Sequence, residues 1–322
     1  MDTAAADDAG LAPLEIVAVD EVADGIRAYT LARPDRGELP PFTPGAHVTL
    51  RVPDGPLRKY SLCGDPAERT RWRIAVKRED AGRGGSRALH ERARVGDRLA
   101  VSAPANAFGL VAAPAYLFVA GGIGITPILS MIRSFGDDPP APWTLVYLSR
   151  DARSAAFLDE LAEPRPRGRV IVHHDAGDPA RAFDLWPLLE KPGRTHVYCC
   201  GPRPLMDAVR DMTGHWTPGR VHFESFVDGA APRPQDRPFA VRLARSGTRL
   251  EVPVGRTILE VLREAGHVVP SSCESGTCGS CRTGLVAGEA EHRDLVLFPD
   301  EQATHIMVCV SRGRGDELVL DL

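Results

Sequence analysis

Three cysteines crowd into nine positions near the C-terminus of this 322-residue chain. Cys273, Cys278 and Cys281 have the spacing C-x4-C-x2-C within SSCESGTCGSCRTG, and Cys309 follows in IMVCVSR. This is the spacing of plant-type [2Fe–2S] clusters, in which each iron binds two thiolates. Zinc is the alternative, although zinc ligands usually come as two separated pairs. The pattern therefore predicts an iron–sulfur cluster, with Cys309 on a returning strand as the fourth ligand.

A glycine-rich turn lies between a buried-type strand and a helical stretch in LFVAGGIGITPILSMI. Gly121, Gly122 and Gly124 let the backbone approach a pyrophosphate, and a helix N-terminus near Thr126 favours the anion. The turn is not the G-x-G-x-x-G fingerprint, and alone it is equally consistent with a tight turn that binds nothing.

A second motif, HVYCCGPRPLM, ends another buried strand. Open parallel sheets bind ligands at the carboxyl edge of their strands, which is where Cys200 and Gly201 come. Alone, Cys200 is better interpreted as a small buried hydrophobic residue. Combined with the glycine turn, it indicates a dinucleotide site. After the second strand of this sheet, the adjacent Arg150 and Asp151 leave the choice between a 2′-phosphate and a ribose hydroxyl open.

The first third of the chain contains two candidate anion sites. In RKYSLC, Arg58 and Tyr60 share one face of a strand, so a cationic fork lies beside an aromatic ring, with Ser61 next in sequence. Residues 84–86 of GRGGSRALHE begin a predicted helix and offer a second site. Each motif alone is consistent with a structural role, and their presence in one domain favours binding.

Three structural segments must position these residues. Short alternating runs over the first hundred or so residues predict an antiparallel β-barrel or sandwich. From Ala115, buried-type strands alternate with the helical stretches TPILSMIRSF, SAAFLDELA and PLMDAVRDM, which is typical of a parallel α/β sheet. A Pro-rich, charged linker follows. The last segment begins with a hairpin at Ser246-Gly247 and a helix with a Thr257/Glu260 capping box that Gly266 closes.

The composition argues against a nucleic-acid-binding, a membrane-spanning or a secreted protein. The formal net charge of −4 provides no basic excess for nucleic acid. The apolar run at 115–132 is interrupted by glycines and a proline, so no membrane span is expected. Seven cysteines are a poor match to a secreted disulfide framework, and the acidic N-terminus lacks the features of a signal peptide. We expect a cytoplasmic, monomeric protein.

Taken together, the motifs R-x-Y-S, G-x-G-G-S, G-G-x-G-I-T-P, C-G-P and C-x4-C-x2-C resemble the ferredoxin–NADP reductase superfamily. The domain order and the stretches VHFESF and SSCESGTCGSC are most similar to the phthalate dioxygenase reductase family. The similarity covers all but the first dozen residues. It implies an FMN-binding β-barrel at 1–110, an NADH-binding α/β domain at 111–228, a linker at 229–237 and a β-grasp, plant-type ferredoxin domain at 238–322.

The resemblance further implies an NADH-dependent oxidoreductase that passes electrons through FMN and the [2Fe–2S] cluster to a Rieske-type aromatic-ring oxygenase. The alternatives are the reductase of an O-demethylase or another monooxygenase, and a zinc-stabilised nucleotide-binding protein. Hydride would move from nicotinamide C4 to flavin N5 without a protein acid or base, because the cofactors supply the chemistry.

The resemblance also assigns residues to the cofactors. Those expected at the flavin are Arg58 and Ser86 at the phosphate with Gly84 and Gly85 in the same turn, Tyr60 and Ser61 against the isoalloxazine, and Lys77 within reach of it. Those expected at the nucleotide are Gly121, Gly122, Gly124, Thr126, Cys200 and Gly201, with Phe226 where flavin and nicotinamide stack. Tyr60, Ser61, Cys200 and Phe226 would act in the hydride transfer.

Overall fold

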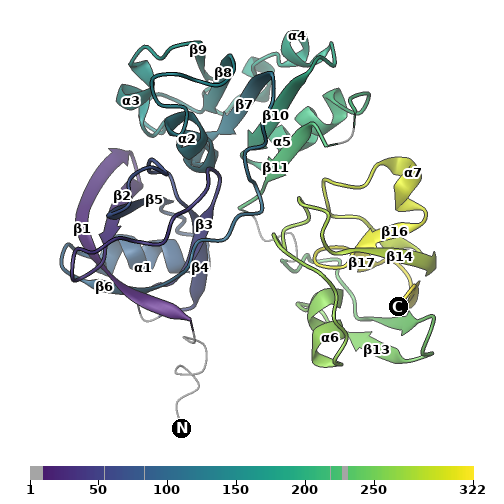
Figure 1. Ribbon diagram of the computed structural model, residues 1–322. Coiled ribbons are helices and arrows are strands. Elements are labelled where there is room, and N and C mark those ends of the chain that lie inside the picture. The colour runs from purple at the N-terminus through teal and green to yellow at the C-terminus, as the bar shows by residue number, and fades with distance from the viewer. Residues whose placement is uncertain (1–9, 54, 83, 218, 227–230) are drawn as a thin grey trace. The chain divides into compact units, whose positions relative to one another are not determined.

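The computed structural model describes residues 10–53, 55–82, 84–217, 219–226 and 231–322 (Figure 1). Contacts divide the chain into two compact units, Met1–Gly201 with Thr217–Val221, and Pro202–Trp216 with His222–Leu322. The helix after Gly201 therefore groups with the C-terminal segment, whereas the sequence analysis places it with the nucleotide sheet. The expected boundaries at 110/111 and 237/238 stay predictions. The boundary at 228/229, where the linker begins, lies outside the described residues, as does most of the acidic N-terminus.

The first sheet is antiparallel, with six strands in the order β4-β3-β6-β1-β2-β5. A bridge between Leu62, just after β4, and Ile74 of β5 joins the two outer strands, so the sheet closes into a barrel. Tyr29, Leu50 and Trp72 help to fill its interior. The elements are β1 (Leu11–Ala23), β2 (Ile26–Ala32), β3 (His47–Arg51), β4 (Leu57–Ser61), β5 (Arg71–Lys77), α1 (Gly85–Arg92) and β6 (Arg98–Ser102).

The second sheet has five strands in the order β11-β10-β7-β8-β9, and β7, β8, β9 and β10 pair in parallel, as predicted. Its elements are β7 (Ala115–Gly121), η1 (Gly122–Gly124), α2 (Ile125–Arg133), β8 (Trp143–Ser149), α3 (Leu158–Ala162), β9 (Gly168–His174), η2 (Pro179–Arg181), α4 (Trp186–Leu189), β10 (Thr195–Cys200), α5 (Arg203–Met212) and β11 (Val221–Glu224). The helix expected over SAAFLDELA is shorter than predicted, because Phe157 has a φ of 65° that no helix interior accepts.

The barrel and the second sheet share a hydrophobic core. One cluster of buried side chains contains Ile26 and Ala75 from the barrel strands together with Phe118 of β7 and Ile128 of α2. No helix among the described residues is long and apolar enough to cross a membrane.

The C-terminal segment forms a five-stranded sheet in the order β13-β12-β18-β14-β16 and a small β15-β17 pair. Its elements are β12 (Phe239–Leu243), β13 (Arg249–Val252), α6 (Ile258–Glu264), β14 (Arg282–Ala287), β15 (Ala290–Glu291), α7 (Pro299–Gln302), β16 (His305–Met307), β17 (Arg312–Gly313) and β18 (Glu317–Leu320). The predicted capping box is confirmed: Thr257 and Glu260 bond reciprocally at 2.8 and 3.0 Å.

Cys309 does not lie on a strand, contrary to the sequence prediction. Strand β16 ends at Met307, and the Met307 carbonyl accepts hydrogen bonds from the backbone of Val310 and Ser311 at 3.2 and 3.0 Å. This tight turn takes the chain out of the sheet, and Cys309 lies within it.

Candidate flavin, nucleotide and iron–sulfur sites

Four thiols gather at the cluster loop of the second unit. Cys273 and Cys278 hydrogen-bond to each other, as do Cys281 and Cys309, and Cys273 also interacts electrostatically with both members of the other pair. Two pairs of thiols match the requirement of two irons for two thiolates each. Over the described residues, no group of three or more His, Cys, Asp or Glu side chains surrounds a single-ion position.

Within each pair one sulfur is the acceptor. The hydrogen bond from Cys278 lowers the pKa of Cys273 to about 3, and the hydrogen bond from Cys309 lowers the pKa of Cys281. The same bonds raise the pKa values of Cys278 and Cys309. The thiolate is the form that binds metal, so each pair already contains one sulfur in an environment suited to a ligand.

The loop backbone also fits a cluster. The Ser275 and Thr277 amides each donate to Cys273 Sγ at 3.4 Å, the contacts by which a protein tunes cluster sulfurs. Gly276 has a φ of 74°, and a Cβ there would lie 2.7 Å from Val310 Cγ2 and 3.0 Å from Asp294 Cα. Only glycine fits this close approach.

The two candidate anion motifs of the barrel meet, as the sequence suggests for a phosphate site. A Cβ on Gly85 would lie 3.1 Å from Arg58 Cγ and 3.3 Å from its Nε. Gly84 caps α1 with a φ of 84° and no side-chain hydrogen bond, and no atom lies within 4 Å of its Cβ position. An uncapped helix start beside a guanidinium therefore fits the phosphate of FMN. Ser86 Oγ accepts a hydrogen bond from the Glu79 amide at 3.0 Å.

The expected ring residues continue from this site along β4. Tyr60 is half-buried against the barrel core, and burial raises its pKa to about 12, so its phenol remains a donor at neutral pH. Ser61 is only 5% exposed. Lys77 is exposed, and its Nζ lies 2.6 Å from Glu79 Oε1. Glu79 therefore contacts both residues, Lys77 through its carboxylate and Ser86 through its backbone amide.

The glycine turn and the cysteine motif are in direct contact at the carboxyl edge of the parallel sheet. β10 runs beside β7, and a Cβ on Gly124 would lie 2.1 Å from the Cys200 carbonyl oxygen. Gly122 has a φ of 53° and open space at its Cβ position. Thr126 and Cys200 are 2% and 1% exposed, and Thr126 Oγ1 donates to the Ile123 carbonyl at 3.1 Å. This arrangement leaves the turn backbone available to a pyrophosphate.

Arg150 and Asp151, the two residues after β8 that bear on the choice of coenzyme, make different contacts. The Asp151 carboxylate accepts a hydrogen bond from the Ser154 amide at 2.8 Å, and that bond lowers its pKa. Arg150 is exposed, and its Cδ lies 3.9 Å from the Cβ position of Gly177, beyond β9. Both residues are exposed, but Asp151 caps its own turn, whereas Arg150 extends toward Gly177.

Phe226 belongs to the second unit and is 47% exposed, whereas the flavin and nucleotide residues belong to the first. Its stacking role therefore stays a prediction. Sequence reasoning missed the polar face of α5, where Arg203 and Arg210 contact residues 293–294 and Asp207 contacts both arginines. The i,i+4 spacing of Arg203 and Asp207 indicates only a pair within the helix.

Comparisons with known proteins identify the same components. Residues 241–312 match the 2Fe-2S iron-sulfur cluster binding domain, and residues 118–211 match the oxidoreductase NAD-binding domain. A phthalate 4,5-dioxygenase oxygenase reductase subunit from Pseudomonas putida is 54% identical over 317 residues, or 98% of each chain. The tert-butanol monooxygenase / tert-amyl alcohol desaturase reductase subunit of Aquincola tertiaricarbonis is 45% identical over 313 residues, or 92% of each.

A solved structure gives the same result. The chain is similar to phthalate dioxygenase reductase, described as a modular structure for electron transfer from pyridine nucleotides to [2Fe–2S], with 52% identity and a TM-score of 0.70. The match covers 98% of this chain and 99% of that one.

Fold and sites thus define a multidomain electron-transfer oxidoreductase with a barrel, a nucleotide-binding sheet and a ferredoxin-type domain. The chain belongs to the phthalate dioxygenase reductase family. Membership confirms the predicted cofactor set of FMN, NADH and a [2Fe–2S] cluster, and the predicted role in supplying electrons to an oxygenase.

Proposed function

We propose that this chain is the NADH-dependent reductase of a Rieske-type oxygenase that acts on an aromatic ring. The observation that carries the proposal is the 54% identity, over 98% of both chains, to the reductase subunit of a phthalate 4,5-dioxygenase. The paired thiols of the cluster loop support it, because they provide a one-electron exit within the same chain as the nucleotide sheet.

On the flavin side, we assign Arg58 and the start of α1 to the FMN phosphate. When bound, FMN accepts a hydride from NADH and releases the electrons singly to the cluster. Arg58 provides the positive charge, and the α1 backbone from Gly85 onward provides N–H donors. Tyr60 presents its ring and a protonated phenol from the same strand, which orients the isoalloxazine. Ser61 and Lys77 complete the proposed set.

On the nucleotide side, the backbone of the glycine turn binds the pyrophosphate, and Cys200 and Gly201 line the nicotinamide. The contact between Gly124 and the Cys200 carbonyl fixes these two elements relative to each other. Thr126 anchors the first turn of α2 through its bond to Ile123. Geometry matters here because hydride transfer depends steeply on how closely the reacting atoms approach. Phe226 is assigned to the stacking position on the family resemblance.

The domain boundaries, the NADH preference and the monomeric state belong to the same proposal. The four cysteines hold the cluster in the domain at 238–322, and a Pro-rich linker connects that domain to the nucleotide domain at 111–228. Arg150 is the residue that opposes the NADH assignment, because an exposed arginine after β8 is able to pair with a 2′-phosphate.

Paired kinetic measurements test the function. The purified protein is supplied with NADH or NADPH and with either a phthalate-type Rieske dioxygenase or a Rieske O-demethylase as acceptor. We expect the higher kcat/KM with NADH and faster reduction of the dioxygenase. A higher kcat/KM with NADPH overturns the coenzyme assignment, and faster reduction of the demethylase overturns the partner.

One observation favours a second partner class. The 45% identical relative from Aquincola tertiaricarbonis serves a tert-butanol monooxygenase, so this family also supplies oxygenases whose substrates are not aromatic. Including such a monooxygenase as a third acceptor separates the two classes.

A further inference from the structure

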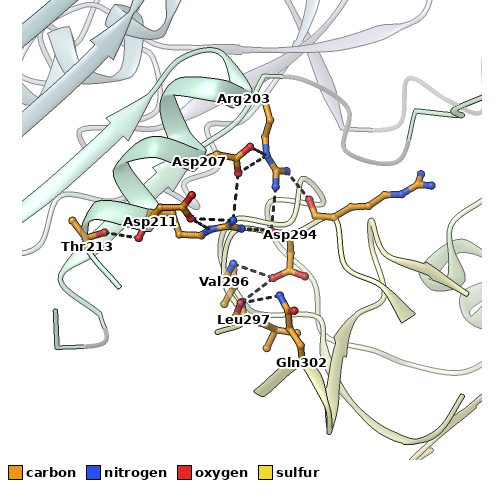
Figure 2. Close-up of polar contacts among 10 residues, drawn as sticks. Arg203, Asp207, Asp211, Thr213, Asp294, Val296, Leu297 and Gln302 are labelled. Atoms are coloured by element: carbon orange, nitrogen blue, oxygen red, sulfur yellow. Dashed lines mark hydrogen bonds and ion pairs between the residues drawn. The ribbon is translucent and has the colours of Figure 1, made fainter. Parts of the chain in front are cut away.

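Helix α5 contacts a segment of the cluster domain through Arg203 and Arg210, and Asp207 contacts both arginines; these three side chains are here named the α5 clamp (Figure 2). Arg203 Nη1 donates to the Arg293 carbonyl at 2.7 Å, and its Nη2 donates to the Asp294 carbonyl at 3.4 Å. Arg210 Nη1 donates to the same Asp294 carbonyl at 3.4 Å. Two guanidinium groups thus converge on adjacent backbone carbonyls some ninety residues away in sequence.

Asp207 orients both guanidinium groups. Its two carboxylate oxygens accept from Arg203 Nε at 2.9 and 3.0 Å, and one of them lies 3.7 Å from Arg210 Nη2. Arg203 is the first residue of α5, where the helix dipole opposes a positive charge. Helix formation therefore does not explain an arginine at this position, whereas its contacts with Asp207 and the cluster domain do.

The clamped segment supports the cluster loop directly. The Leu295 amide donates to the Gly276 carbonyl at 2.8 Å, and Asp294 Cα approaches Gly276 closely enough to exclude any side chain there. The Asp294 carboxylate is buried and accepts from the Val296 and Leu297 amides at 3.0 and 2.8 Å, which makes the segment rigid. Gly276 lies between two cluster cysteines, so a displacement at the clamp reaches the cluster through one backbone hydrogen bond.

The other end of the clamp is joined covalently to the nucleotide site. Arg203 follows Cys200 by three residues, through Gly201 and Pro202. Pro202 fixes the backbone at this junction, because its ring locks φ near −65°. The chain that lines the proposed nicotinamide site thus continues directly into the helix that carries the clamp.

We propose that Arg203, Asp207 and Arg210 are positioning residues that hold residues 293–295, and through Leu295 the cluster loop, in the arrangement that accepts electrons. The inference rests on the proposed electron path. Each NADH delivers two electrons as a hydride, and the flavin passes them to the cluster in two one-electron steps. The clamp acts on those steps alone, because Arg203, Asp207 and Arg210 are not among the residues assigned to the hydride transfer.

The test compares the two half-reactions in the holoprotein. We expect Arg210→Ala and Arg203→Ala to leave NADH-driven flavin reduction, read with ferricyanide, within twofold of the unmodified protein. Bleaching of the cluster in stopped flow should slow at least about tenfold, because transfer between redox centres depends steeply on their geometry. A tenfold loss of rate corresponds to about 1.4 kcal/mol of activation free energy. Arg203→Lys keeps the charge without the fork and should show an intermediate loss.

Hydrogen–deuterium exchange provides a readout that needs no turnover. Exchange over residues 293–297 should increase in both alanine variants. The matched control is Arg245→Ala, which removes an exposed arginine paired with Asp321 at 3.0 Å in the same unit and should change neither rate nor exchange. Unchanged cluster bleaching in the clamp variants overturns the inference, as does an equal loss in flavin reduction. If the unmodified protein itself fails to bleach its cluster with NADH, the proposed function is wrong instead.

Discussion

Two arginine-centred junctions tie the functional parts of this chain together, and they are built differently. In the first unit, Arg73 of the barrel and Arg133 of α2 both contact the Glu160 carboxylate, Arg73 at 2.8 Å. Arg133 also donates to the Cys63 carbonyl, and the Arg73 guanidinium lies 5.1 Å from the centre of the Phe157 ring. Here two positively charged guanidinium groups share one negatively charged carboxylate. Phe157, which lies against Arg73, belongs to the hydrophobic core shared by the barrel and the parallel sheet.

In the second unit the arginines of the α5 clamp bind only neutral backbone carbonyls of the cluster domain, and the acids that pair with them, Asp207 and Asp211, belong to the same helix. The C-terminal core cluster, so far as the described residues go, contains residues from Phe239 onward and none from α5. The difference matches the two reactions. Hydride transfer needs atoms in contact, which a part-buried, charge-paired junction maintains. Single-electron transfer needs no such contact between reacting atoms, so a polar junction is sufficient.

The largest effect comes from removing the group that the clamp positions. Cys309→Ser should abolish the cluster, because one iron loses a thiolate, and iron content should fall from about two atoms per chain to near zero. Reduction of ferricyanide by NADH should persist, since the Glu160 junction is untouched. Cys63→Ser is the control: its thiol donates to the Arg73 carbonyl at 3.3 Å, away from the cluster, so iron should be retained. Retention of two irons by Cys309→Ser contradicts the ligand assignment.

A smaller effect is expected from breaking the first junction. Glu160→Ala leaves Arg73 and Arg133 without their shared carboxylate and should lower the free energy of unfolding by about 2 kcal/mol, less than for a fully buried pair. The control is Glu163→Ala, at an exposed position three residues later. It should change the free energy of unfolding by less than about 0.5 kcal/mol. Denaturant unfolding of both variants, with Arg210→Ala alongside, compares the junctions directly. If Arg210→Ala destabilises as much as Glu160→Ala, the two junctions are alike.

The sequence predicted the parts of these sites that are local. The spacing of the cysteines, the glycine turn and the start of α1 depends on a few neighbouring residues, and each is found as expected. The left-handed Phe157, the turn that carries Cys309 and the partner of Arg203 were not predicted. Each depends on tertiary contacts. The core position of Phe157, the end of the strand before Cys309 and a carbonyl some ninety residues from Arg203 do not affect the local sequence pattern. The contacts of Glu160 with Arg73 and Arg133 also join residues far apart in the sequence.

Lowering the pH tests the Glu160 junction more mildly than the substitutions do. Burial raises the pKa of Glu160, but the hydrogen bond from Arg73 and the charge of Arg133 outweigh it and hold that pKa below its ordinary value. The carboxylate therefore stabilises the folded state fully above the unfolded pKa of about 4.3 and loses this contribution as the pH falls through the lower folded value. Asp20, 3.9 Å from Arg73, is a second acid at this junction.

Glu160→Gln isolates this contribution. The difference in unfolding free energy between the unmodified protein and this variant should be constant from pH 7 to about 5 and should shrink below about pH 4. Urea denaturation at several pH values measures it. A difference that stays constant down to pH 3 shows that Glu160 is not the titrating group.

The smallest expected effect is that of salt on the α5 clamp. Raising the ionic strength from 0.1 to 1 M shortens the Debye length from about 10 to about 3 Å, which screens the part-exposed pairs of Asp207 with Arg203 and Arg210. Such pairs contribute a few tenths of a kcal/mol, so cluster bleaching should slow about twofold while flavin reduction is unchanged. Asp207→Asn should begin at the slower rate and respond less to salt, because the guanidinium–carbonyl bonds and the Arg210–Asp211 pair remain and only the ion pairs with Asp207 are gone. Stopped-flow traces at both salt concentrations decide the matter. If Asp207→Asn and the unmodified protein show the same salt dependence, the effect arises elsewhere, and Asp207 does not orient the clamp.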